Sequence, residues 1–174
     1  GVRSSTRAGY KTVLNVLRKD PFGSRRIDKV TFAEAKAWLA RLQTVDGRGY
    51  SSIHSIRGVL RPAFRMAVEN DWIRKNPFDF ELATVVVNDS VTREALTRKQ
   101  ERRFLEFVKA DRHYSRYYEG IFILFKTGLK ISEFCGLTIA DIDFGARRIR
   151  VERQLQRTSD MRYVIQAPKT EKGI

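Results

Sequence analysis

The charged residues best placed to do chemistry are Lys130 and Glu133, three positions apart in a segment that predicts a short helix over residues 131–136. This spacing puts both side chains on one face of the helix. A cation held beside a carboxylate at a helix start, where backbone amides also point outward, can receive a phosphate. On spacing alone, an ordinary surface ion pair is the more common explanation.

A second set of cations lies on a helix predicted over residues 51–69. One flank of this helix is apolar, and the other carries His54, Arg57, Arg61 and Arg65. Guanidinium groups about one turn apart suit a DNA groove, because each can contact a phosphate or a guanine edge through two parallel hydrogen bonds. Ser51 and Ser52 are the expected N-caps and further candidate DNA contacts. The alternative is an amphipathic helix whose basic flank is simply solvated.

Net charge favours a polyanionic partner. The chain has 174 residues, of which 34 are Lys or Arg and 20 are Asp or Glu, and its net charge is +14. Residues 1–80 contribute +9 and residues 81–174 contribute +5, so both halves are basic. Nucleic acid is therefore the first candidate partner, and an anionic membrane surface is the second.

The remaining composition excludes several classes of protein. The longest apolar run, residues 121–125, is far too short to cross a membrane. The single cysteine, Cys135, cannot form an internal disulfide framework or a cysteine-rich zinc site. A chain without an internal disulfide framework is typical of a reducing, cytoplasmic setting.

Hydrophobic spacing predicts a helical chain that ends in strands. Thr31–Glu34 and Thr97–Gln100 are capping boxes, in which side chains at both ends satisfy backbone amides. The first opens a helix whose expected core residues are Phe32, Ala35, Trp38, Leu39 and Leu42. Alternation in residues 148–152 and 162–165, joined by a turn at 158–160, predicts a β-hairpin. Further helices are expected over residues 5–19 and 115–126.

These elements predict two domains. Residues 1–82 form an all-helical domain, and residues 83–92, which lack helical periodicity, form an extended linker. Residues 93–174 begin a mixed α/β domain with a small antiparallel β-sheet. The expected fold class is therefore mainly α with α+β.

The segment that contains Lys130 resembles the first active-site motif of the tyrosine recombinases, the DNA integrases of phages and conjugative transposons. Its residues 127–143 run Thr-Gly-Leu-Lys-Ile-Ser-Glu-Phe-Cys-Gly-Leu and on to Asp-Ile-Asp. The family pattern differs at one position, where it has arginine instead of Lys130. Residues 1–82, with Asn76-Pro77-Phe78 near their end, resemble the core-binding domain. Residues 167–173 resemble the hairpin that carries an active-site lysine, here Lys169.

The resemblance implies site-specific recombination through a 3′-phosphotyrosyl intermediate. Lys130 occupies the position of the arginine that clamps the scissile phosphate, Glu133 orients it, and Lys169 protonates the leaving 5′-hydroxyl. No metal or other cofactor is implied, since the covalent link conserves the bond energy. Family members act as dimers to tetramers on two duplexes, and the implied location is the bacterial cytoplasm.

Two departures from the family pattern keep an alternative open. First, Lys130 places a point charge where the family has a planar guanidinium. Second, the nucleophilic tyrosine is expected beyond residue 174, so none of the tyrosines present is a candidate nucleophile. We therefore expect this chain to bind DNA without catalysing recombination. The alternatives are a non-enzymatic DNA-binding regulator or architectural protein that reuses the fold, and an RNA-binding protein.

Overall fold

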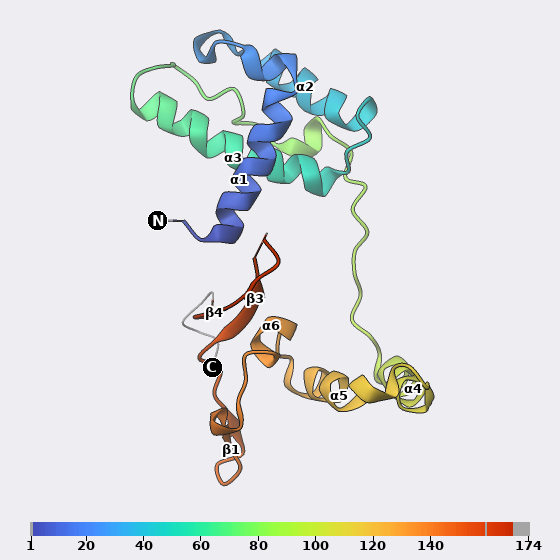
Figure 1. Ribbon diagram of the computed structural model, residues 1–174. Helices are drawn as coiled ribbons and strands as arrows, with labels where there is room; N and C mark the ends of the chain where they lie inside the picture. The colour runs from blue at the N-terminus through green and yellow to red at the C-terminus, as the bar shows by residue number, and fades with distance from the viewer. Residues whose placement is uncertain (1, 159, 169–174) are drawn as a thin grey trace. The chain divides into compact units, whose positions relative to one another are not determined.

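The computed structural model describes residues 2–158 and 160–168, which fall into two compact units divided between Arg93 and Glu94. Figure 1 shows the helices of the first unit and the mixed helices and short strands of the second. The fold class is mainly α with α+β, as the sequence predicts. None of the helices in the described ranges is long and apolar enough to cross a membrane.

Three α-helices form the first unit, and short 3-10 helices connect or follow them. The α-helices are α1 (Ser4–Arg18), α2 (Phe32–Thr44) and α3 (Tyr50–Glu69), and the 3-10 helices are η1 (Pro21–Ser24), η2 (Ile27–Lys29) and η3 (Leu82–Thr84). The predicted capping box at α2 is present: the Thr31 hydroxyl accepts from the Glu34 amide at 3.2 Å, and the Glu34 carboxylate accepts from the Thr31 amide at 2.9 Å.

The core of this unit joins α2 and α3 to the segment that follows them. Ala35, Trp38, Leu39 and Leu42 are buried as predicted, whereas Phe32 at the first position of α2 is exposed. Phe78 of the Asn-Pro-Phe turn is fully buried and packs edge-on against Trp38. Burial of a side chain of that size contributes roughly 1.5–3 kcal/mol. The turn therefore belongs to the core of the first unit.

The start of α3 differs from the prediction. Gly49 is the N-cap, so Ser51 and Ser52 lie inside the first turn and do not cap the helix. The amide of Tyr50 instead donates to Oδ1 of Asp89 at 2.8 Å. A carboxylate 39 residues away thus does the work expected of a local serine hydroxyl.

The expected linker over residues 83–92 is shorter in the structure. Val86 is buried in the first unit's core, and the amide and carbonyl of Val87 bond to the side chain of Gln43 at 2.9 and 2.8 Å. Hydrogen bonds of Val87 and Asp89 thus hold the chain to the first unit as far as Asp89, and all of the residues 90–97 are exposed and without helix or strand. Val86 is therefore a core residue, and the half-buried Val85 packs against the core, although the two give no helical pattern.

The second unit begins with helices and ends with two hairpins. Its helices are α4 (Arg98–Ala110), η4 (Ser115–Tyr117), α5 (Tyr118–Thr127), α6 (Ile131–Phe134) and η5 (Ile139–Asp141). Its strands are β1 (Ile142–Asp143), β2 (Arg148–Ile149), β3 (Gln154–Arg157) and β4 (Tyr163–Gln166). The capping box predicted at Thr97 and Gln100 is present.

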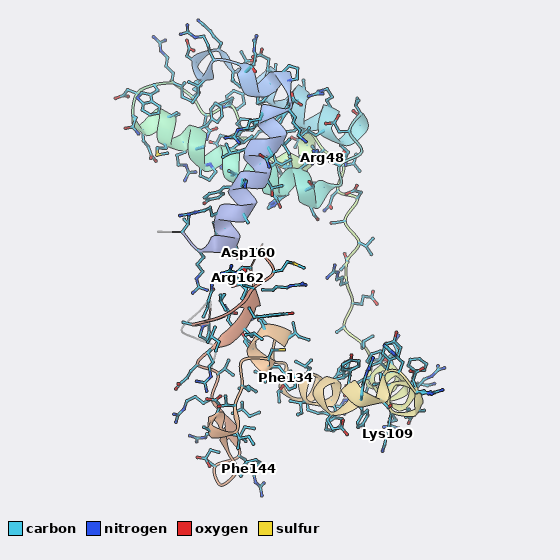
Figure 2. All side chains as sticks on the ribbon, in the orientation of Figure 1. Arg48, Lys109, Phe134, Phe144, Asp160 and Arg162 are labelled. Atoms are coloured by element: carbon cyan, nitrogen blue, oxygen red, sulfur yellow. The ribbon has the colours of Figure 1, made fainter. Side chains whose placement is uncertain are left out.

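Strand pairing differs from the predicted hairpin of residues 148–152 with 162–165. Arg148 and Ile149 pair with Asp143 and Ile142, and β4 pairs with β3 instead. Both pairs are antiparallel, and they form two separate two-stranded sheets in the described part of this unit, rather than one. Phe144, at the turn of the β1–β2 hairpin, is exposed (Figure 2).

Candidate functional site

A tight turn between α5 and α6 places the Lys130–Glu133 pair. Gly128 ends α5 in the left-handed conformation with φ of 69°, which glycine adopts without steric cost. The Thr127 hydroxyl donates to the Ile123 carbonyl at 2.7 Å. The ring of Phe134 in α6 (Figure 2) lies 3.4 Å from where a methyl group at Gly120 of α5 would be, so the two helices pack closely here.

Lys130 and Glu133 make the contact that their spacing predicts. Nζ of Lys130 donates to Oε1 of Glu133 at 2.8 Å, and the Lys130 amide donates to Oε2 at 3.0 Å. The hydrogen bond from the Lys130 side chain, followed by that from its amide, lowers the pKa of the Glu133 carboxyl. The Lys130 side chain is 74% exposed and that of Glu133 only 12%. An ionised, nearly buried carboxylate therefore holds an ammonium group at the surface, where its remaining protons can bind an anion.

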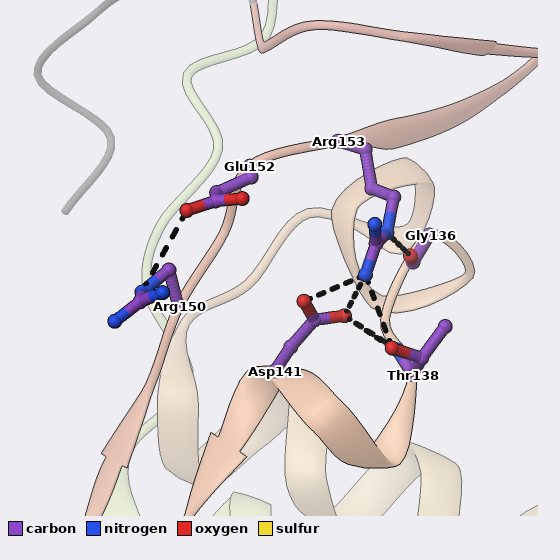
Figure 3. A network of polar contacts seen from close by, with 6 residues as sticks. All are labelled: Gly136, Thr138, Asp141, Arg150, Glu152 and Arg153. Atoms are coloured by element: carbon purple, nitrogen blue, oxygen red, sulfur yellow. Dashed lines mark hydrogen bonds and ion pairs between the residues drawn. The ribbon is translucent and has the colours of Figure 1, made fainter.

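A polar network lies at the other end of α6 (Figure 3). One terminal nitrogen of Arg153, Nη2, donates to both carboxylate oxygens of Asp141 at 2.6 Å and to the Thr138 hydroxyl at 3.0 Å. Its Nε donates to the Gly136 carbonyl at 3.1 Å. The amide of Thr138, and then Arg153, lower the pKa of Asp141 from 3.8 to about 2. The network joins the segment that follows α6 to the start of β3.

The arginines of α3 do not form the uniform row that helical spacing predicts. Arg57 is half-buried: its guanidinium donates to the Phe80 carbonyl and lies 5.2 Å from the centre of the Phe80 ring. Burial lowers the pKa of this arginine. Arg61 pairs with Asp79, its Nε donating to Oδ1 at 2.9 Å, while Arg65 is exposed. The three cations therefore have three different environments.

Three of the predicted DNA contacts, His54, Arg57 and Arg61, line one open groove, and Ser51, Ser52 and Arg65 do not line it. Ser51, Ser52 and His54 are exposed in the first turns of α3. His54, Arg57, Arg61 and Asp79 line an open groove of about 490 Å³. The structure brings these residues of α3 together with Asp79, which sequence reasoning missed because nothing local pairs it with α3. Lys169 lies outside the described residues.

Sequence reasoning also missed Arg153. It lies in a stretch of alternating residues, where it reads as one more solvent-facing cation of a strand. Its partner Asp141 stands in the Asp-Ile-Asp part of the motif, but spacing does not indicate that the two meet. In the described part of the chain, no group of three or more His, Cys, Asp or Glu residues is arranged to hold a metal ion.

Comparisons with known proteins identify relatives of this chain. Residues 94–168 match the model of the phage integrase family. The transposase from transposon Tn916 of Enterococcus faecalis is 42% identical over 172 residues, which is 99% of this chain and 42% of the relative. A XerC-like tyrosine recombinase of Caldanaerobacter subterraneus is 26% identical over 141 residues, covering 74% of this chain and 35% of that protein.

A solved structure extends the likeness to three dimensions. An arginine-to-lysine variant of the Tn1549 transposon integrase, in complex with a circular intermediate DNA, superposes with a TM-score of 0.92 at 42% identity. The match covers 98% of this chain and 54% of that one. The chain spans about two fifths of the length of the Tn916 transposase. The chain belongs to the phage integrase family of tyrosine recombinases.

Proposed function

We propose that this chain provides the DNA-binding core-binding domain and the first part of the catalytic domain of a conjugative-transposon integrase. The whole protein would cleave and rejoin DNA at specific sites through a 3′-phosphotyrosyl intermediate. The observation that carries this proposal is the exposed ammonium group of Lys130, held at 2.8 Å by Glu133 inside the Thr-Gly-Leu-Lys-Ile-Ser-Glu motif. The identity to the Tn916 transposase along nearly the whole chain supports it.

Each of the three site residues has a distinct role in this reaction. Lys130 stabilises negative charge on the scissile phosphate in the transition state, where a preorganised cation is most effective. Glu133 holds the ammonium in position. Lys169 gives a proton to the 5′ oxygen as its bond to phosphorus breaks. The attacking tyrosine and the remaining catalytic residues would come from the rest of the catalytic domain.

Lysine at position 130 should slow this reaction without abolishing DNA binding. An ammonium group cannot donate two parallel hydrogen bonds to the non-bridging oxygens as a guanidinium does. Loss of one preorganised donor commonly costs on the order of 10²–10³ in rate. The positive charge remains, so affinity for the phosphate backbone should be nearly unchanged. That the Tn1549 arginine-to-lysine variant is in complex with DNA supports this expectation.

The partner we propose is double-stranded DNA at a transposon end or attachment site, bound by a dimer to tetramer in the bacterial cytoplasm. The basic charge of both halves of the sequence and the DNA complexes of the Tn1549 integrase support this partner. The candidate contacts are Ser51, Ser52, His54, Arg57, Arg61, Arg65 and Lys169. The groove that Asp79 lines brings three of these candidate contacts, His54, Arg57 and Arg61, to one surface.

A suicide-substrate assay tests the proposal in a chain as long as the curated relatives. A DNA substrate nicked just downstream of the scissile phosphate releases the short fragment that carries the new 5′-hydroxyl, and the loss of this fragment traps the covalent adduct. Lys130→Arg should raise the rate of adduct formation on the order of 10²-fold, whereas Lys126→Arg should not change it. Lys126 is a matched control because it also pairs with a glutamate, Glu101, at 2.7 Å. Binding without adduct in both variants would instead favour the non-enzymatic DNA-binding protein.

A further inference from the structure

Arg153, just before β3, binds three residues of the segment 136–141 that follows α6. Its guanidinium binds the Gly136 carbonyl after α6, the Thr138 hydroxyl, and both oxygens of Asp141 in η5. The Asp141 side chain is only 8% exposed, and it also accepts from the Thr138 amide at 2.7 Å. Such a fully bonded, nearly buried carboxylate is held in one position far more firmly than an exposed ion pair.

Close contact between backbones also holds the start of β3 against the end of α6. A methyl group at Gly136 would lie 2.8 Å from the Arg153 carbonyl oxygen and 3.0 Å from Cα of Gln154. Only glycine leaves room for the start of β3 to approach the end of α6 so closely. The side chain of Arg153 thus bonds to the Gly136 carbonyl, and the backbones of the two residues lie in close contact.

Pairing between β3 and β4 connects this contact between α6 and β3 to the last described residues. Gln154 lies opposite Gln166 in the antiparallel register, and its side-chain amide donates to the Ala167 carbonyl at 3.3 Å. Ala167 precedes Lys169 by two residues in the sequence. On the other side, Gly136 follows Glu133 by three residues. A short series of packed and hydrogen-bonded residues therefore links the Lys130–Glu133 pair to the strand that leads to Lys169.

We propose that Arg153 is a positioning residue: it locks the root of the β3–β4 hairpin onto the end of α6 and so sets the place of β4, the strand that precedes Lys169 in the sequence. This inference rests on the proposed function, since it assigns Lys169 the role of proton donor. Proton transfer needs donor and acceptor within hydrogen-bond reach, so a small displacement of the hairpin should slow leaving-group departure and leave DNA binding intact.

The test separates leaving-group protonation from every other step. It uses two suicide substrates in a chain of the relatives' length that carries Lys130→Arg. One substrate has the normal 5′ oxygen at the scissile bond, and the other has sulfur in its place. A thiol has a pKa of about 8.5, against 15.7 for water, so a thiolate leaves without being protonated. A defect in leaving-group protonation should therefore disappear with sulfur.

Arg153→Ala should lower the rate of adduct formation at saturating DNA on the order of 10²-fold with the oxygen substrate and little with the sulfur substrate. The Kd for DNA should remain that of the parent. Arg153→Lys should lose rate in the same substrate-dependent way, because an ammonium cannot reproduce the planar fork of bonds. Arg150→Ala is the matched control, since this exposed arginine is three residues away and pairs with Glu152 at 3.6 Å. It should match the parent with both substrates.

Equal losses on both substrates, or a loss confined to DNA binding, would overturn the inference. If Arg153→Ala does not fold, as thermal unfolding would show, Arg153→Lys and Thr138→Ala decide the question with the same two substrates. Failure of the proposed function looks different: the parent chain would form no adduct with either substrate.

Discussion

Nε of Arg61 donates to Oδ1 of Asp79 at 2.9 Å, so a cation expected to bind DNA is already paired with a carboxylate 18 residues further along the chain. The hydrogen bond from Arg61 lowers the pKa of Asp79, as do the nearby charges of Arg61, Arg65 and Arg57. One ionised carboxylate thus lies among all three arginines of α3. Before Arg61 can bind a phosphate, this pairing must be given up or shared.

Asp79→Asn should therefore strengthen binding to duplex DNA of arbitrary sequence. Removing the competing charge frees Arg61 for one more phosphate, so the slope of log K against log salt should steepen by about 0.9. Titrations at several salt concentrations measure this slope. Asp71→Asn, which removes an equal charge from an exposed residue of the same unit, is the control. Equal effects of the two variants would mean that only net charge matters.

Arg57 and Arg65 should differ in what they contribute. Arg57→Ala removes a charged hydrogen bond to the Phe80 carbonyl and a contact with the Phe80 ring, so it should lower the free energy of unfolding by about 1–2 kcal/mol. Arg65→Ala, at an exposed site, should leave stability unchanged and reduce the salt slope by about 0.9. Denaturant unfolding and DNA titration of both variants test this division. The idea fails if Arg65→Ala is the destabilising change.

Asp141 should make stability depend on acidity. Its pKa is about 2 in the folded chain and 3.8 ordinarily, so the unfolded state binds protons first as the pH falls. The stabilisation from its ionised form is complete above the ordinary pKa and is lost as the pH falls through about 2. Asp141→Asn should lower stability near neutral pH and flatten this decline. Urea unfolding from about pH 5 to pH 2 measures this decline in the free energy of unfolding, with Asp143→Asn as the control. Identical pH curves for wild type and Asp141→Asn would refute the prediction.

Asp89 should stabilise the start of α3 although it lies 39 residues away. Asp89→Ala leaves the Tyr50 amide without its carboxylate and should cost about 1 kcal/mol of unfolding free energy, as loss of an N-cap does. Ser51→Ala and Ser52→Ala should have almost no effect, because neither serine caps the helix in the structure. Chemical denaturation of the three variants distinguishes them. Destabilisation by a serine variant equal to that of Asp89→Ala would show that the cap is local.

The sequence by itself determined the features that depend on neighbouring residues. The capping boxes at Thr31 and Thr97 are present because the hydroxyl and its partner are only three residues apart, within reach of one helical turn. The Lys130–Glu133 pair forms for the same reason. Apolar spacing likewise predicted the buried face of α2, apart from Phe32 at its exposed first position.

Only the tertiary structure decided which distant residues meet. Asp89 caps α3, Asp79 pairs with Arg61, and Arg153 binds Asp141, each across 12 or more residues. No local pattern predicts such contacts, because they form only once the intervening chain has packed. The strands show the same limit: alternation predicted that residues 148–152 pair with 162–165, whereas only Arg148–Ile149 is a strand there, it pairs with β1, and β3 pairs with β4. Local hydrogen bonding thus decided the elements, and long-range charge pairing and burial decided their partners.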